Sequence, residues 1–379
     1  MAQKLKTDRV LFITVVVMVF FGAVMLYSAS SVMAQLKYGS SWHFFYRQLA
    51  WMAVAITAMM LLKRTHYRAL QNPAVAFSAV AVALILLLAV YFIDGSFHRW
   101  IRVGPVGIQP SELAKPALVI FLAFFVTWRA RAINNRYTLL PAALAIGLLT
   151  AGVAAGDLGT PIVMMATVVV VFFVAGLEWR YCMIALSVAA VGVVFLVASK
   201  PYRLRRVVEY FDPGYKLVDR IDSQGRIKTY LNTSLAARDT NYQAEQSKIA
   251  VGAGGPVGLG LMQGKQKLLY LPEAHTDFIY AVVGEELGLV GSLAVLLGFL
   301  VILWRGLRAT IFIPDDFGRY LALGVTTMLV AQAFMNISVV LGMIPNKGIP
   351  LPMISSGGSS LVSTLALLGI LLNVSEHAG

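Results

Sequence analysis

The stretch Tyr270-Leu-Pro-Glu-Ala-His-Thr-Asp-Phe-Ile-Tyr280 leads directly into Ala281-Val-Val-Gly-Glu-Glu-Leu-Gly288 and then into an apolar run that ends near Trp304. It therefore places several carboxylates at the start of a hydrophobic helix long enough to span a membrane. Ionisable side chains are costly at a membrane boundary, so their presence there indicates a functional site. These carboxylates are the first candidates for chemistry.

The composition of the whole chain is that of a membrane protein. Its 379 residues are 59% hydrophobic and only 13% charged, and the mean hydropathy is +0.76. Recurring apolar runs of near-bilayer length predict an all-α polytopic membrane protein with about ten transmembrane helices. The expected spans are 10–29, 45–62, 73–93, 113–128, 139–155, 161–175, 182–198, 278–304, 320–341 and 354–374.

The net charge of +13 is explained largely by membrane topology. If the N-terminus is inside, the short cytoplasmic segments hold more Lys and Arg than the short outer loops. This bias follows the positive-inside rule and predicts that both termini are cytoplasmic. Much of the remaining basicity lies in one long loop, so no nucleic-acid partner is expected.

The sequence also bears on a cleaved signal peptide, on disulfides and on zinc. A basic N-terminal segment before the first apolar run is typical of a signal peptide, but further spans insert in any case, so a retained first helix is expected. The single cysteine, Cys182, excludes an intramolecular disulfide, and the five His residues are too scattered for a zinc site.

One loop is long, and we predict that residues 199–277, between the seventh and eighth spans, are extracytoplasmic. Loops of this length usually carry function or local structure. Its middle, 216–241, is polar and is expected to be mobile. Its glycine-rich end, 252–260, fits neither a P-loop nor a dinucleotide motif. A turn or re-entrant bend is the simpler interpretation, and a backbone nest facing a pyrophosphate is the alternative.

Polar residues on other loops of the same predicted face add to a possible extracytoplasmic site. Ser111 is expected to cap a helix, with Glu112 favourable near its positive end. Lys115 opposes the helix dipole and needs a partner, and we predict an ion pair with Asp157. Asp277 is either a reactive group or only an acidic residue at the start of a helix.

Several of these residues also have simpler interpretations. Glu285 and its neighbour Glu286 point in different directions, so at least one must face a polar interior. Lys347 contacts a ligand or merely extends to the membrane interface, and Trp100 is an alternative interface anchor. The small residues 355–360 pack helices closely or begin a helix that faces an anion.

Taken together, these segments resemble the SEDS family (shape, elongation, division and sporulation), which includes FtsW- and RodA-type proteins. The resemblance covers nearly the whole chain, and the stretch 270–288 resembles the division-type FtsW branch slightly more than RodA. The motifs that carry it are Arg99-Trp-Ile, Gln109-Pro-Ser-Glu-Leu-Ala-Lys115, Asp157-Leu-Gly-Thr160, Tyr202-Arg203 with Arg206, the glycines of 254–260, Tyr270–Ile279, Gly284–Gly288, Lys347-Gly, Leu351-Pro and Gly357-Gly-Ser-Ser360.

Three departures from the family pattern stand out. Ala155-Gly156 stand where the family usually has Gln-Pro, which affects local backbone stiffness rather than the carboxylate that follows. Ser356 replaces a usual tyrosine, so an aromatic contact is lost. The segment 216–241 is longer than is typical.

The resemblance implies a peptidoglycan glycosyltransferase that polymerises lipid II on the outer face of the bacterial cytoplasmic (inner) membrane. Asp277 matches the family's catalytic aspartate, which would activate the acceptor hydroxyl as a general base. Basic side chains, or a divalent cation such as Mg²⁺ or Mn²⁺, would neutralise the departing diphosphate. The expected substrate-binding or supporting residues are Arg99, Trp100, Glu112, Lys115, Asp157, Glu273, His275, Glu285 and Lys347.

The resemblance also implies partners, namely a class B penicillin-binding protein transpeptidase and other membrane proteins of the divisome or elongasome. The leading alternative function is a lipid II flippase, a transporter that would need a polar path through the bilayer. Glu285 and Glu286 could line such a path. A non-catalytic divisome scaffold is a third interpretation, but it leaves the loop carboxylates without a task.

Overall fold

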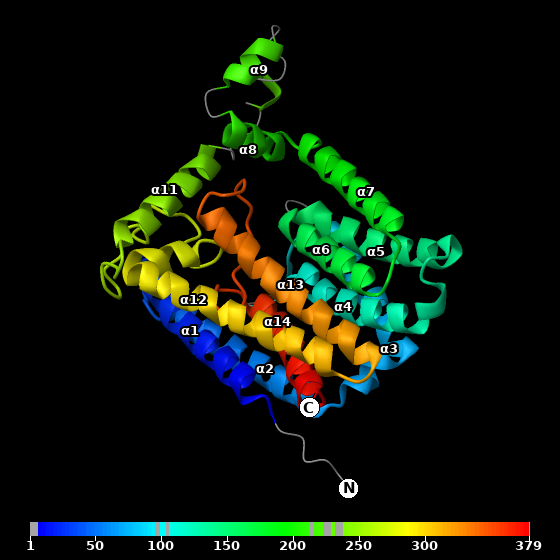
Figure 1. Ribbon diagram of the computed structural model, residues 1–379. Coiled ribbons are helices and arrows are strands. Elements are labelled where there is room, and N and C mark those ends of the chain that lie inside the picture. Colours follow the sequence, from blue (N-terminus) through cyan, green and yellow to red (C-terminus); the bar gives the residue numbers. More distant parts are fainter. Residues whose placement is uncertain are drawn as a thin grey trace.

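The computed structural model describes residues 7–94, 99–103, 106–212, 215–222, 229–231 and 238–378. Within these residues, ten apolar helices lie where the sequence predicts ten spans (Figure 1). Nine are long and apolar enough to cross a membrane, and α6 has only 16 residues. They are α1 (Arg9–Tyr38), α2 (His43–Arg64), α3 (Pro73–Ile93), α4 (Pro110–Trp128), α5 (Arg136–Gly156), α6 (Gly159–Val174), α7 (Trp179–Ala198), α12 (Ile279–Phe312), α13 (Asp316–Val340) and α14 (Gly358–Glu376). The chain is therefore a multi-pass membrane protein, as predicted.

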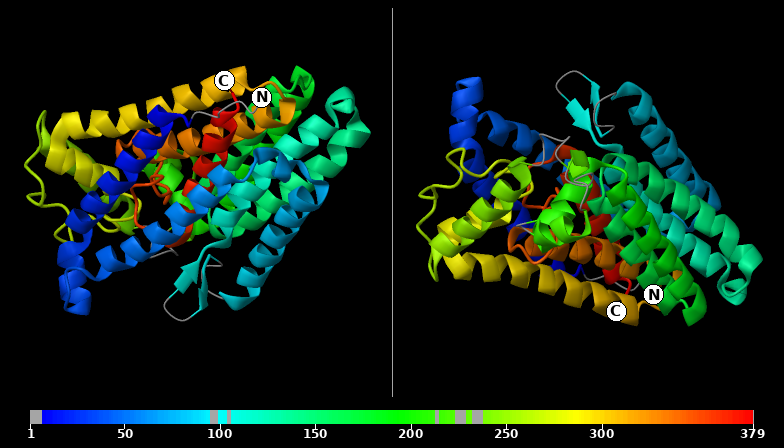
Figure 2. Two further views of the ribbon diagram at one scale, coloured as in Figure 1. Left: turned by 90° about the horizontal axis from the view of Figure 1, so that it is seen from below. Right: turned by 90° about the horizontal axis from the view of Figure 1, so that it is seen from above.

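Three helices form the centre of the bundle. The most apolar windows of α4, α13 and α14 are 72–78% buried inside the protein, whereas that of α7 is only 6% buried. A helix that is apolar all round and buried belongs to the protein core, and one that is apolar and exposed faces lipid. The views in Figure 2 show α14 crossing the middle of the molecule with α2 and α4 beside it.

The start of α1 and the end of α14 lie at the same end of the bundle (Figure 2). Thr7 donates a hydrogen bond to Glu376 (2.8 Å), and Lys63 pairs with Glu376 (2.9 Å). Asp8, just before α1, pairs with Arg305 of α12 (2.7 Å). The first helix is thus an integral part of the bundle.

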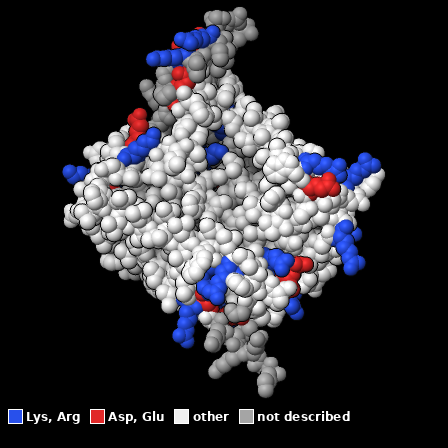
Figure 3. Space-filling view, viewed as in Figure 1, with Lys and Arg blue, Asp and Glu red and all other residues white. Residues whose placement is uncertain are grey.

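Figure 3 shows that charged side chains gather around the margin of one face, while a broad band between them is uncharged. This pattern is expected where a surface contacts the hydrocarbon core, because an isolated charge there is costly. Basic side chains also lie inside a hollow in the upper half of this view.

The long segment 199–277 contains helices that the sequence did not predict in detail. These are α8 (Pro201–Phe211), α9 (Lys216–Ile221) and α11 (Arg238–Gly254). Of the part expected to be mobile, residues 223–228 and 232–237 lie outside the described residues. Short elements among the described residues include two 3₁₀ turns, η1 (Tyr67–Gln71) and η2 (Ala130–Ala132). They also include an antiparallel hairpin, β1 (Ile101–Val103) and β2 (Val106–Ile108), in which Ile101 pairs with Ile108.

Helix α12 is broken at Gly288, whose φ is 63° and ψ is −157°. The backbone groups freed by the break bind the glycine-rich end of the long segment: Leu289 N donates to Gly255 O (2.9 Å), and Gly260 N donates to Glu286 O (2.9 Å). The cluster therefore forms the predicted bend. A Cβ at Gly258 would lie 2.1 Å from Glu286 O, so this close approach requires glycine.

Candidate active site

Asp277 lies in the loop that precedes α12, two residues before the helix begins at Ile279, and its side chain is half-buried. Its backbone carbonyl accepts a hydrogen bond from Asn336 Nδ2 of α13 (2.7 Å). Gly348, in the loop between α13 and α14, lies directly against the carboxylate, because a Cβ added there would be 2.5 Å from Asp277 Oδ2. The carboxylate thus stands between two loops.

Burial raises the pKa of the Asp277 carboxyl from its ordinary value of 3.8 to about 7. The carboxylates of Glu273 and Asp157 raise this pKa further, whereas the positive charges of Arg99 and Arg206 lower it. A carboxyl group with this pKa is ionised in a substantial fraction at neutral pH and is still basic enough to accept a proton. These are the properties required of a general base.

Three basic residues belong to the same electrostatic neighbourhood. Burial lowers the pKa of the Arg206 guanidinium of α8, and the charge of Asp277 partly offsets this effect. Burial also lowers the pKa of Lys347, and Asp157 partly restores it. In the described part of the chain, the Nε atoms of Arg99 and Arg206 are buried without a hydrogen-bond partner. Buried donors that lack a partner suit an anionic ligand.

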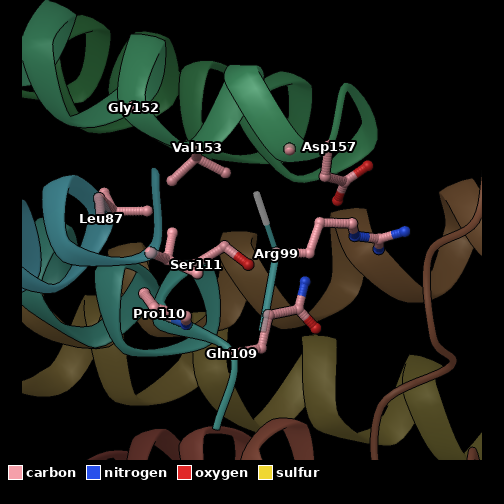
Figure 4. A pocket seen from close by; sticks show the side chains of 10 residues that line it. Leu87, Arg99, Gln109, Pro110, Ser111, Gly152, Val153 and Asp157 are labelled. Atoms are coloured by element: carbon pink, nitrogen blue, oxygen red, sulfur yellow. The ribbon is translucent and has the colours of Figure 1, made fainter. Parts of the chain in front are cut away.

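Arg99 and Asp157 both line a small pocket at the start of α4 and the end of α5 (Figure 4). The start of the β1–β2 hairpin is held by Asp94, whose Oδ2 accepts bonds from Arg99 N (3.0 Å) and Trp100 N (3.3 Å). The Trp100 ring lies close to Gly107, because a Cβ added at Gly107 would be 3.3 Å from the ring. Trp100 therefore packs within the hairpin.

Two predictions for the start of α4 were wrong. The helix begins at Pro110 with Gln109 at the N-cap position, so Ser111 does not cap it and instead lines the pocket. Lys115 does not pair with Asp157. Its Nζ lies 2.6 Å from Glu112 Oε2, and both side chains are only 2% exposed. Spacing of i and i+3 places the two on one face of the same helix, and this outweighs the more distant carboxylate.

Asp157 has a local structural task in addition to its place in the pocket. Its Oδ1 accepts a bond from Gly159 N (2.9 Å), and its Oδ2 accepts one from Thr160 Oγ1 (2.6 Å) at the first turn of α6. A carboxylate at this position satisfies free amides and favours the positive end of the helix. The motif Asp157-Leu-Gly-Thr160 therefore begins a helix and aims a carboxylate at the site.

Glu273 and His275 shape the loop before Asp277. Glu273 is exposed, and its backbone adopts the left-handed conformation (φ 56°). Its carboxylate accepts a hydrogen bond from Thr276 Oγ1 (2.7 Å). His275 is buried against the Phe44 ring of α2, with ring centroids 4.9 Å apart, and burial lowers its pKa. A neutral, packed imidazole is suited to holding the loop rather than to binding an anion.

Glu285 and Glu286 lie away from Asp277 and are occupied by the end of the long segment. Glu285 Oε1 accepts bonds from Lys265 N (2.7 Å) and Gln266 N (3.1 Å). Glu286 forms an ion pair with Lys267 and accepts a bond from Ser28 of α1 (2.7 Å). Both glutamates therefore bind backbone amides of the loop and hold it against the bundle. These amides supply the polar surroundings that two adjacent buried carboxylates require.

The Cell cycle protein family of FtsW, RodA and SpoVE matches residues 8–379 of this chain. The chain belongs to this family. It is 37% identical over 375 residues to a protein of Geobacter sp. (strain M18) named "Probable peptidoglycan glycosyltransferase FtsW", covering 98% of this chain and 97% of the relative. It is also 36% identical to stage V sporulation protein E of Bacillus subtilis, with 99% of each chain covered. The resemblance to SEDS proteins is thus confirmed.

Two solved structures share the fold of this chain. One chain, from a structure described as "Structural coordination of polymerization and crosslinking by a peptidoglycan synthase complex", is 28% identical with a TM-score of 0.75, covering 99% of both chains. The crystal structure of Thermus thermophilus rod shape determining protein RodA is 26% identical with a TM-score of 0.68, covering 98% of this chain and 97% of that one. The bundle described above is therefore the family's architecture.

A metal ion was one expected means of neutralising the diphosphate. Among the described residues of this family member, no three His, Cys, Asp or Glu side chains lie together so as to hold a metal ion. The diphosphate contacts proposed below are basic side chains, because buried donors of Arg99 and Arg206 lack a hydrogen-bond partner.

Sequence reasoning missed two residues of this candidate site. Gln332 and Asn336 of α13 are buried and bind the loops around Asp277. The signal was present, since two amides one helical turn apart interrupt an otherwise apolar span. Such polar residues inside a membrane helix usually face the bundle interior and contact polar groups.

Proposed function

We propose that this chain is a peptidoglycan glycosyltransferase that joins lipid II units into glycan strands for septal or elongation cell-wall synthesis. The observation that carries the proposal is the half-buried Asp277 carboxyl, with a pKa of about 7, surrounded by basic side chains with free donors. The names of the full-length relatives support the same activity.

In the proposed reaction, the Asp277 carboxylate accepts the proton of the acceptor sugar's 4-hydroxyl. The hydroxyl oxygen forms a bond to the anomeric carbon of the donor sugar. The bond between that carbon and the diphosphate oxygen breaks, and the polyprenyl diphosphate leaves with the electron pair. A diphosphate is already a good leaving group, so the protein has mainly to activate the acceptor and stabilise negative charge.

Arg99, Arg206 and Lys347 are assigned the role of stabilising the negative charge that develops on the diphosphate. Fixed cations aimed at developing charge stabilise a transition state most where water is largely excluded. The unpartnered Nε donors of the two arginines and the half-buried state of Lys347 support this role.

The proposal treats residues 1–379 as one integral membrane domain with both termini cytoplasmic and residues 199–277 extracytoplasmic. It places the protein in the bacterial inner membrane, with a class B penicillin-binding protein transpeptidase as partner. The structural neighbour from a complex that coordinates polymerisation and crosslinking supports such a partner. Other divisome or elongasome membrane proteins are expected around the pair.

The flippase alternative is less well supported. It requires a polar path through the bilayer, and Glu285 and Glu286 were its candidates. Both carboxylates are instead 0–1% exposed and bound to loop amides, a lysine and a serine.

The decisive experiment uses purified full-length protein, with and without its transpeptidase, and labelled lipid II. Formation of glycan strands by the wild type, detected by gel electrophoresis, supports the proposal. Lipid II that crosses vesicle membranes without being polymerised would instead support the flippase.

Lys347 provides a specific prediction for the leaving group. Lys347→Ala should lower turnover at saturating lipid II by about 10-fold or more, since a cation near the diphosphate is lost. Lys347→Arg keeps the charge and should retain part of the activity, although the two cations differ in shape and hydration. Turnover is compared at equal protein abundance, and equal turnover for wild type and Lys347→Ala would contradict the assignment.

Membrane orientation can be tested independently of catalysis. The buried Cys182 is first replaced by Ala, and single cysteines are then introduced at the exposed positions Lys216 and Arg131. An impermeant thiol reagent applied to intact spheroplasts should label Lys216→Cys and spare Arg131→Cys. The reverse pattern would place Asp277 in the cytoplasm and exclude the proposed polymerase.

A further inference from the structure

Two side-chain amides on α13 bind the loop that joins α13 to α14. Gln332 and Asn336 are spaced i and i+4, so they project from the same face of the helix. They are only 2% and 1% exposed. A buried amide is costly unless it is hydrogen-bonded, so its partners indicate what it holds in place.

Asn336 ties two separate loops together. Its Nδ2 donates one hydrogen bond to Asp277 O and another to Ile349 O, each 2.7 Å long. The first carbonyl belongs to the residue proposed as general base. The second lies two residues after Lys347, the proposed diphosphate contact. A single side chain thus fixes the backbones of both reactive loops relative to each other.

Gln332 repeats this arrangement one turn earlier. Its Nε2 donates to Pro350 O (2.8 Å), and its Oε1 accepts a bond from Lys115 Nζ of α4 (2.8 Å). The consecutive carbonyls of Ile349 and Pro350 are therefore held by consecutive turns of α13. The second amide also joins this loop to the buried Glu112–Lys115 pair.

The tethered loop forms one wall of the Asp277 site. Gly348 is adjacent to Ile349 and lies against Asp277 Oδ2. A Cβ added at Gly348 would be 2.5 Å from this oxygen, so only the hydrogen of a glycine fits there. The amide of Asn336 therefore holds the Gly348 backbone against one side of the carboxylate. Release of this backbone would let the carboxylate hydrate and change its position.

We infer that Asn336, assisted by Gln332, is a positioning residue for glycosyl transfer that sets the separation between the Asp277 loop and the Lys347 loop. The inference rests on the proposed function, because it names residues that organise the same site. Asn336 acts through backbone carbonyls and does not itself touch the reacting groups.

The charged groups that face Asp277 come from four parts of the fold. They are Arg99 before β1, Asp157 before α6, Arg206 on α8 and Glu273 on the same loop. Replacing Asn336 by Leu alters none of these charges. A shift in the pH dependence of the variant would therefore report a change in the position or hydration of Asp277.

The test compares Asn336→Leu with wild type in lipid II polymerisation. We expect kcat to fall about 10²-fold, as for a displacement of catalytic groups by about 1 Å, with little change in KM. The acid limb of the pH–rate profile should move to lower pH, because a hydrated Asp277 carboxyl ionises more easily.

A matched control is Asn373→Leu. Asn373 of α14 is 4% exposed and binds two backbone groups at the opposite end of the bundle. It donates to Lys63 O in the last turn of α2 (2.7 Å) and accepts from Tyr67 N at the start of η1 (2.8 Å). This variant should lose thermal stability comparably and keep the wild-type kcat and pH profile. The comparison separates positioning of the site from a general loss of stability.

A folded Asn336→Leu protein with the kcat and pH profile of Asn373→Leu would overturn the inference while leaving the proposed polymerase intact. If Asn336→Leu does not fold, Gln332→Met takes its place, since it removes the bond to Pro350 O while Glu112 still pairs with Lys115. Unchanged kcat and pH profile in that variant would also overturn the inference. A wild-type protein that makes no glycan would instead overturn the proposed function, and this inference with it.

Discussion

Glycan polymerisation by Asp277→Asn protein is expected to fall by about 10²–10⁴-fold, the usual effect of losing a general acid–base group. The amide keeps the shape of the side chain and cannot accept the acceptor hydroxyl's proton. In the wild type, kcat/KM should rise with pH through an acid limb whose midpoint lies near the Asp277 pKa of about 7. Strand formation from labelled lipid II at several pH values measures both effects.

The same substitution should not destabilise the protein, and this distinguishes lost chemistry from lost folding. The pKa of Asp277 is about 7 in the folded protein, above its ordinary value of 3.8, so the folded state binds more protons between about pH 4 and pH 7. The stabilisation that Asp277 contributes to the folded wild-type protein is therefore lost as the pH rises through that window. Asp277→Asn should unfold at a higher temperature than wild type at pH 8, and the difference should shrink towards pH 4.

Asp316→Asn is a suitable control for this prediction. Asp316 is exposed at the start of α13 and pairs with Arg319, at the end of the bundle proposed to be cytoplasmic. It should retain wild-type polymerisation. Normal strand synthesis by a folded Asp277→Asn protein would remove Asp277 from the role of base.

The second large effect is expected on stability, from the buried ion pair of α4. Lys115→Met leaves the Glu112 carboxylate unpaired in a site where both side chains are 2% exposed. Breaking a buried pair by removing one partner typically costs about 3–5 kcal/mol, whereas replacing both partners costs much less. Thermal unfolding of Lys115→Met, Glu112→Gln and the double variant should therefore show strong positive coupling.

The chain supplies a matched comparison for that cycle. Arg319 and Asp316 have the same i, i+3 spacing and a 2.9 Å contact, but their side chains are 38% and 56% exposed. Exposed pairs contribute little to stability, so the corresponding cycle there should show weak coupling. Additive losses for Glu112 and Lys115 would mean that the pair does not form in the membrane.

The fold was largely predictable because each span is an apolar run of about bilayer length, and this signal does not depend on tertiary contacts. Even the shortened sixth span, expected at 161–175, is found as Gly159–Val174. The helices inside 199–277 were not predicted, because α8 and α11 are polar or amphipathic and are fixed partly by packing. Tyr210 of α8, for example, donates to Met343 O (2.7 Å) in the loop after α13.

The sequence predicted which residues of the candidate site lie near one another, but not all of the contacts that they make. Asp277, Asp157, Arg99 and Lys347 share one neighbourhood, as their common predicted membrane face implied. The partner of Lys115 was missed although the i−3 position of Glu112 was visible in the sequence. Asn336 was missed although its amide interrupts an apolar span, because its partners are backbone carbonyls and the sequence does not show which carbonyls they are.

The break of α12 at Gly288 has a consequence for how this region opens. Amides freed in the middle of a membrane helix ordinarily find partners within the same segment or in a neighbouring helix. Here Leu289 and Val290 donate to the carbonyls of Gly255 and Pro256, far away in the chain. The helix and the glycine-rich end of the segment 199–277 are therefore a single cooperative unit, in which neither can unfold locally without exposing the other's backbone to solvent exchange.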